Sequence, residues 1–108
     1  MQSPRDTDIG ELLRQLSKAG VEFIVVGGAA AVLHGAPITT EDLDIVHRRS
    51  PENVARLKTL LDGLDAHVRE LANRRLPPQE SALLGDGHVL LSTRLGPVVP
   101  QNLVHCEM

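Results

Sequence analysis

Two aspartates separated by a single leucine restrict the possible fold and chemistry of this chain more than any other feature. Asp42-Leu43-Asp44 opens an apolar run. Alternate residues of a strand face the same side, so Asp42 and Asp44 project together while Leu43 and Ile45 point into a core. Neighbouring carboxylates repel each other unless a cation lies between them, and Mg²⁺ is commonly held by one or two carboxylates plus substrate phosphates. The pair predicts a Mg²⁺ site or, as the alternative, a solvated strand end.

A glycine pair, Gly27-Gly28, closes the preceding apolar run of residues 21–26. A strand that turns directly into a helix leaves backbone N–H groups without partners, and these groups attract phosphate together with the helix dipole. Glycine permits the sharp turn and the close approach of a ligand. The segment matches neither a Walker loop nor a Rossmann fingerprint. It predicts a phosphate cradle, with a tight turn packed against a neighbour as the alternative.

Taken together, these residues resemble the nucleotidyltransferase superfamily, which shares its fold with DNA polymerase β. The family pattern is a hydrophobic strand, Gly-Gly or Gly-Ser, about a dozen residues, and then Asp-hydrophobic-Asp/Glu-hydrophobic. The match is similar to a small bacterial branch that includes abortive-infection-type toxins, and it covers about residues 9 to 98. The segments that carry it are Gly27-Gly28-Ala29-Ala30, His34-Gly35 and Thr40-Glu41-Asp42-Leu43-Asp44.

The resemblance implies a Mg²⁺-dependent transferase that moves a nucleoside monophosphate from a nucleoside triphosphate to a hydroxyl acceptor on RNA (tRNA included) or protein. In that case Gly27, Gly28 and Thr40 bind the nucleotide. Asp42 and Asp44 are the catalytic residues and the metal ligands. Because the branch includes toxins, the resemblance also implies a toxin–antitoxin component with an antitoxin partner.

Two positions depart from the family pattern. An arginine expected before the threonine is Ile38, and the third metal carboxylate, expected within residues 96–100, is Val99. A valine can neither hold a catalytic metal nor activate a hydroxyl. The alternative hypotheses are therefore a catalytically inactive remnant that binds nucleotide or a partner, and a purely structural α/β fragment. The pattern ends at about residue 98, which predicts a C-terminally shortened member of the fold.

The net charge and the cysteine count exclude two classes of protein, strongly basic nucleic-acid binders and multi-cysteine zinc proteins. The net charge is −3, and the single cysteine, Cys106, excludes an internal disulfide and any multi-cysteine zinc site. Arginines do cluster at Arg48-Arg49, Arg69 and Arg74-Arg75. Arg48-Arg49 follow the aspartate strand and are candidates to meet a phosphate, with a solvated face as the alternative. His34 is interpreted as a helix C-terminal cap or as a residue that orients the loop.

Length and composition predict one domain over residues 1–108. Phe23 is the one aromatic residue, so the core must be built from leucine, valine, isoleucine and alanine. Such a core is of modest stability, and we expect that a homodimer would add to it. The sequence contains no run approaching the ~20 apolar residues of a membrane span, and its polar N-terminus does not resemble a signal peptide. We therefore expect a cytoplasmic protein without a membrane partner.

The hydrophobic pattern predicts an α/β (α+β) domain, a mixed sheet with helices packed against it, as in the nucleotidyltransferase fold. Thr7 or Asp8 caps a helix that runs to Lys18, and Ser50 caps another that runs through Leu61. The remaining expected segments are a buried strand at 21–26, a short helix at 29–33, a loop at 36–41, strands at 42–47 and 66–70, a loop with one turn at 71–86, and a last strand at 87–95.

Overall fold

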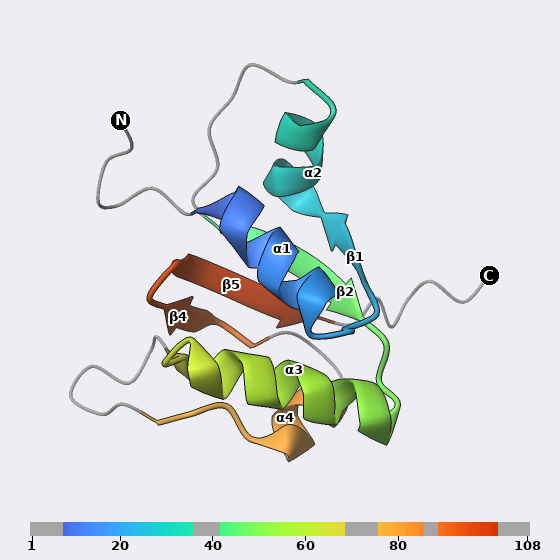
Figure 1. The fold of residues 1–108 in the computed structure, drawn as a ribbon, viewed down its shortest axis with the longest axis vertical. Helices are drawn as coiled ribbons and strands as arrows, with labels where there is room; N and C mark the ends of the chain where they lie inside the picture. Colours follow the sequence, from blue (N-terminus) through green and yellow to red (C-terminus); the bar gives the residue numbers. More distant parts are fainter. Residues whose placement is uncertain (1–7, 36–41, 69–75, 86–88, 102–108) are drawn as a thin grey trace.

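The computed structural model describes residues 8–35, 42–68, 76–85 and 89–101. Four helices and five strands lie within these ranges (Figure 1). In chain order they are α1 (Ile9–Lys18), β1 (Phe23–Val26), α2 (Gly27–Leu33), β2 (Leu43–His47), α3 (Pro51–Gly63), β3 (His67–Val68), α4 (Glu80–Leu84), β4 (Leu91–Thr93) and β5 (Gly96–Gln101). None of the helices in this described part is long and apolar enough to cross a membrane.

The strands form one mixed sheet in the order β1-β2-β5-β4-β3. β5 runs parallel to β2, and the other neighbouring pairs are antiparallel. The predicted class, a mixed sheet with helices packed against it, is therefore confirmed. The finer assignment to the nucleotidyltransferase fold stays a prediction.

The two faces of the sheet have different surroundings. Leu43, Ile45 and Val98 are almost completely buried and point to one face. α1 and α3 cover that face, and the same core contains Leu12, Leu16, Val54, Leu57 and Leu61 from these two helices. Since side chains alternate along a strand, Asp44 and its paired residue Val99 point to the opposite face. The helices thus leave the aspartate on the side of the sheet that they do not cover.

The predicted starts of α1 and α3 and the end of α1 are confirmed by their caps, whereas α3 runs to Gly63, two residues beyond the predicted Leu61. The Asp8 carboxylate accepts a hydrogen bond from the Glu11 N–H at 3.2 Å, and Gly20 takes a φ of +79° after the last turn of α1. Ser50 Oγ accepts from the Asn53 N–H at 3.2 Å, with Pro51 in the first turn of α3. The alternative cap, Thr7, and the loop at 36–41 lie outside the described residues.

Two predictions about strands were wrong. Residues 21–26 were expected to be a buried strand, but β1 is an edge strand and Ile24 is 58% exposed. The strand at 87–95 was expected to be the last, but β5 follows it and occupies the middle of the sheet. Pro97 and Pro100 made β5 hard to predict, because prolines argue against a central strand. The loop with one turn expected at 71–86 agrees with the described residues 76–85, where the five-residue helix α4 forms that turn.

Asn53 ties the helix layer to two strands. Its side chain is fully buried at the start of α3. Its amide nitrogen donates to the carbonyls of Glu22 (3.0 Å) and Arg48 (2.8 Å), and its oxygen accepts from the Glu22 N–H (2.7 Å). One side chain therefore joins the residue before β1 to the residue after β2. The arrangement places β1 and β2 in the register that defines the candidate site.

His47, the last residue of β2, is buried on the helix-covered face. Its Nε2 donates to the Leu83 carbonyl at 2.8 Å, because a carbonyl can only accept. Its Nδ1 is buried without a hydrogen-bond partner among the described residues. Burial lowers the pKa of His47, the Leu83 carbonyl opposes this, and the Arg49 charge lowers it further. His47 is therefore neutral in the folded protein at pH 7 and acts as a core residue.

We expect this neutral histidine to make stability depend on pH. A folded-state pKa below the unfolded value of about 6.5 means that the unfolded chain binds the proton more readily. The contribution is present above about pH 6.5 and is lost as pH falls through the folded-state pKa. Urea unfolding from pH 7.5 to 5.5 should show this slope in the wild type. His47→Gln, which can still donate to the Leu83 carbonyl, should reduce it. An unchanged slope in His47→Gln would contradict the assignment.

Candidate functional site

The candidate site lies where β1 ends, α2 begins and β2 starts. β1 pairs with β2 so that Val26 is opposite Asp44. This register brings Asp44 beside Gly27, the residue after Val26. A Cβ built on Gly27 would lie only 2.5 Å from Asp44 Oδ2, and Gly27 has a φ of +70°. Both observations require glycine here, so Asp44 and the glycine turn form one unit.

Asp42 directly precedes β2 and is half-buried, as is Asp44. The fully buried Leu43 lies between them, and Ile45 follows in the core. The predicted alternation around Asp44 is therefore confirmed. Asp42 and Asp44 thus lie at the start of one strand, Asp44 beside the glycine turn, and carboxylate oxygens are ligands for a hard cation.

Val99 lies next to Asp44 on the neighbouring strand. The parallel register of β2 and β5 pairs their Cα atoms, so the two side chains share a face of the sheet. Val99 is 5% exposed, and it is not a member of the main core cluster beneath the helices. The side chain nearest to Asp44 across the strands is thus apolar. No group of three or more acidic, histidine or cysteine side chains suited to a metal occurs among the residues that the structure describes.

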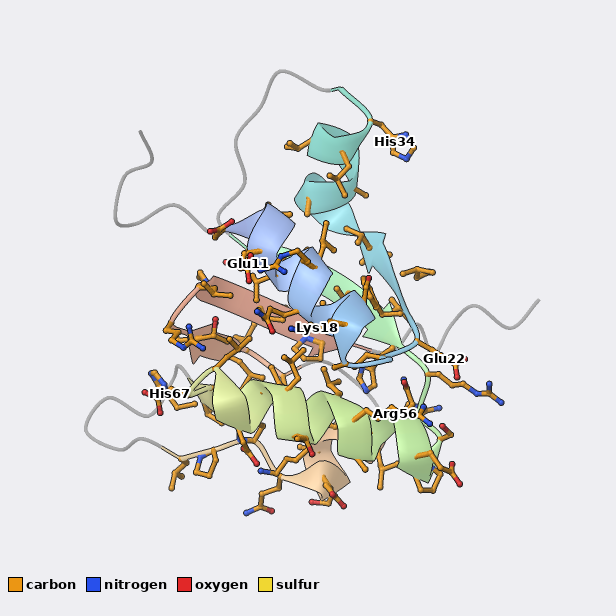
Figure 2. The ribbon with its side chains drawn as sticks, viewed as in Figure 1. Glu11, Lys18, Glu22, His34, Arg56 and His67 are labelled. Carbon is orange, nitrogen blue, oxygen red and sulfur yellow. The ribbon has the colours of Figure 1, made fainter. Side chains whose placement is uncertain are left out.

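The glycine pair is the first turn of α2, which continues from β1 without a loop and projects beyond the sheet (Figure 1). The predicted direct passage from strand to helix is confirmed, although the helix begins at Gly27 rather than at Ala29. The residue before the turn, Val26, provides no side-chain cap. His34 is the C-cap residue of α2, as predicted, and its exposed side chain lies at the far end of the helix from Gly27 (Figure 2).

Arg48 and Arg49 do not lie beside the aspartates. They follow the other end of β2, and four residues of extended strand separate Asp44 from Arg48 by about 13 Å. Arg48 forms an ion pair with Glu22 at 3.1 Å, and Arg49 donates to the Leu84 carbonyl at 3.4 Å. Their role as candidates to meet a phosphate stays a prediction, and the fold places them at the other end of β2 from Asp44. Thr40 and Ile38 lie outside the described residues.

Comparison of the chain with protein-family models, with curated proteins and with solved structures found no match in any of the three. The site is therefore interpreted from its own residues.

Sequence reasoning missed the residue that holds the site in register. Asn53 contacts neither Asp42 nor Gly27, but its three hydrogen bonds join the chain ahead of β1 to the chain after β2. A signal for it was present, since Asn53 stands three residues after the Ser50 cap, where a polar side chain often returns to the backbone. Its long-range partners could not be known before the fold.

Proposed function

We propose that this chain binds a nucleoside triphosphate with Mg²⁺ through Gly27, Gly28, Asp42 and Asp44, for transfer of a nucleoside monophosphate to a hydroxyl acceptor. The observation that carries the proposal is the contact between the Gly27 turn and Asp44. It joins the two motifs of the sequence, separated by 44 − 27 = 17 positions, in one place. The β1–β2 register produces this juxtaposition, and the proposal gives it a function as a phosphate and metal site.

The residues present fit a magnesium ion. Two carboxylates offer oxygen ligands, and Mg²⁺ in phosphoryl-transfer sites is held by one or two carboxylates together with the phosphates of the substrate. Asp42 and Asp44 would hold it. When bound, Mg²⁺ neutralises phosphate charge and polarises the phosphoryl group for attack.

The chain's own residues would bind and orient the nucleotide. Gly27 has no Cβ, so the backbone of the turn is accessible to a phosphate close to Asp44. The first N–H groups of α2 have no intrahelical partner and receive no cap from the side chain of Val26, so the proposal assigns them as donors to a phosphate. Asn53 keeps β1 and β2 in register and therefore acts as a positioning residue. RNA and protein both supply the hydroxyl acceptors that the proposal requires.

Calorimetric titration of ATP, CTP, GTP and UTP with Mg²⁺ tests the binding step. We expect metal-dependent binding by the wild type and its loss in Asp42→Ala/Asp44→Ala, because the ligands of the cation are removed. Asp62→Ala is the matched control, since Asp62 is an exposed acid that pairs with Lys58 on α3. Its binding should equal that of the wild type. A wild type that binds none of the four nucleotides would exclude the proposal.

A second candidate function is nucleotide or partner binding without transfer. Val99 favours it, because the side chain next to Asp44 on β5 is apolar and nearly buried. Such a site keeps its phosphate cradle and two carboxylates, but no third carboxylate from Val99 is there to hold a second metal or to activate a hydroxyl. The two candidates share their ligand and differ in turnover.

Val99→Asp separates the two candidates. The register places the new carboxylate beside Asp44, so we expect Mg²⁺ to raise the melting temperature of this variant more than that of the wild type. We also expect the variant, given a nucleoside triphosphate, Mg²⁺ and RNA, to transfer the nucleoside monophosphate to an RNA hydroxyl and release pyrophosphate. Val99→Asn is the neutral control of the same size. Turnover by the wild type would favour the transferase, and a Mg²⁺ response no larger in Val99→Asp than in Val99→Asn would contradict the placement of the site.

A further inference from the structure

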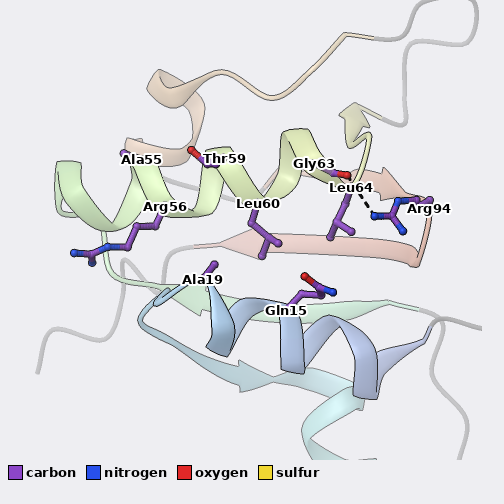
Figure 3. A pocket seen from close by; sticks show the side chains of 9 residues that line it. All are labelled: Gln15, Ala19, Ala55, Arg56, Thr59, Leu60, Gly63, Leu64 and Arg94. Carbon is purple, nitrogen blue, oxygen red and sulfur yellow. Dashed lines mark hydrogen bonds between the residues drawn. The ribbon is translucent and has the colours of Figure 1, made fainter.

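A groove of about 530 Å³ lies between α1 and α3, on the helix side of the sheet (Figure 3). Leu60 and Leu64 of the α3 segment point toward α1, and Gln15 and Ala19 of α1 point toward α3 (Figure 3). The other lining residues are Ala55, Arg56, Thr59, Gly63 and Arg94. Small residues on both sides allow another backbone to approach closely. Since Asp44 points to the opposite face, this groove is separate from the nucleotide site.

Two arginines stand at opposite ends of the groove (Figure 3). The stem of Arg56 packs over the end of α1, where a Cβ built on Gly20 would lie 3.6 Å from Arg56 Cδ. Arg94, in the turn between β4 and β5, donates from its N–H to the Leu64 carbonyl at 3.1 Å and from Nη2 to the Gly63 carbonyl at 3.5 Å. Neither guanidinium forms an ion pair within the described ranges. The nearby Glu11 carboxylate is bound by Arg14 and Gln15.

The two arginines are attached to α3 at points one heptad apart. Arg56 and Gly63, whose carbonyl accepts from Arg94, are seven residues apart, a rise of about 10 Å between their backbones along the helix. Two carboxylates seven residues apart on a second helix have the same rise and lie on one side of it. Residues three and four positions after the first carboxylate would face the apolar floor between the arginines. An amphipathic helix therefore matches the groove in both charge and apolar surface.

We propose that the groove between α1 and α3 is a docking site for an acidic amphipathic helix of a partner protein, with two carboxylates that pair with Arg56 and Arg94. The helix lies along the groove, and its apolar residues cover Leu60 and Leu64. This docking leaves the opposite face of the sheet open, so a partner helix and a nucleotide can bind together.

A designed peptide tests this proposal without knowledge of the natural partner. The probe is a fluorescent, hydrocarbon-stapled helix with two glutamates seven positions apart and leucines three and four positions after the first. A peptide with glutamine in place of both glutamates is the matched probe. We expect the acidic peptide to bind the full chain in fluorescence anisotropy, and about tenfold more weakly to Arg56→Gln/Arg94→Gln. The affinity of the glutamine peptide should not change between the two proteins.

Two further variants show that the groove itself is occupied. Ala55→Trp places a large side chain in the groove from an exposed position and should weaken binding at least as much as the arginine variant. Lys58→Gln removes one positive charge from another side of α3, where Lys58 pairs with Asp62, and should bind the peptide as the wild type does. Thermal melts of each variant confirm that the fold is retained.

Several results would overturn the docking proposal. Equal affinity of the acidic and glutamine peptides, or an arginine variant that binds the acidic peptide as the wild type does, would exclude pairing with the two arginines. A long-chain dicarboxylate that binds with the same arginine dependence when the peptide fails would make the groove a small-molecule site. A dimer in sedimentation that dissociates in Arg56→Gln/Arg94→Gln would make a second copy the occupant. Nucleotide titration is independent of these outcomes.

Discussion

Asn53→Ala is expected to lower the free energy of unfolding by about 2 to 3 kcal/mol, because it leaves partly buried backbone groups without partners and removes a fully buried side chain. The fully buried amide makes three hydrogen bonds, two to Glu22 and one to the Arg48 carbonyl. The Glu22 carbonyl also accepts from the Arg48 N–H at 3.1 Å, so it keeps one bond in the variant. The Glu22 N–H and the Arg48 carbonyl lose theirs. Urea unfolding monitored by circular dichroism measures the change.

Asn53→Asp distinguishes hydrogen bonding from packing. The carboxylate has the size of the amide and can still accept from the Glu22 N–H, but it cannot donate to the two carbonyls. We expect a loss at least as large as that of Asn53→Ala at pH 7, because a buried charge then faces two carbonyl oxygens. Glu52→Ala, one residue earlier on the exposed side of α3, is the control and should change stability by less than about 1 kcal/mol. Equal stability of Asn53→Ala and wild type would show that this network is not needed.

Gly27→Ala has the second large expected effect, on both stability and nucleotide binding. Its φ of +70° is costly for any residue with a Cβ, and the new Cβ would approach Asp44 Oδ2 to 2.5 Å. The backbone strain and the required shift of Asp44 together cost about 3 kcal/mol. Because the shifted carboxylate is a proposed metal ligand, we expect Mg²⁺-dependent nucleotide binding to fall below detection in calorimetry even where the variant is folded.

Alanine substitutions at two other glycines distinguish the backbone strain at Gly27 from its contact with Asp44. Gly35 has a φ of +96°, but a Cβ there would meet nothing within 4 Å, so Gly35→Ala should cost only the backbone strain of about 1 kcal/mol. Gly10 in α1 has neither strain nor a close neighbour, and Gly10→Ala should stabilise the protein by about 0.5 kcal/mol. If Gly27→Ala proved no worse than Gly35→Ala, the contact with Asp44 would have no energetic importance.

Local signals predicted the ends of the helices and the position of the aspartates. The caps at Asp8 and Ser50 and the turn at Gly20 depend on neighbours within three or four residues, so the sequence contains all that is needed. The alternation of Asp44 with Leu43 and Ile45 has the same origin, since the period of a strand is a local property. The class of fold followed from the order of these segments.

Local sequence patterns could not predict the position of each strand within the sheet. Nothing in residues 21–26 distinguishes an edge strand from a buried one, because the difference lies in whether another strand pairs with it. β5 was missed since its two prolines oppose strand propensity, whereas the burial of Val98 and Val99 between β2 and β4 favours it. Sequence order places Arg48 and Arg49 directly after the aspartate strand, and the extended strand puts about 13 Å between Asp44 and Arg48.

The sequence by itself determined the two motifs, their local conformations and the mixed α/β class, because these depend on periodicity and on short-range hydrogen bonds. Only the tertiary structure decided that the motifs meet. The antiparallel register of β1 and β2 brings Asp44 against Gly27, and the parallel register of β2 and β5 brings Val99 beside it. Both registers pair residues that are far apart in the chain. Asn53 links the segments next to β1 and β2, and a shared core holds the sheet together. Such long-range contacts form only when the whole sheet is assembled.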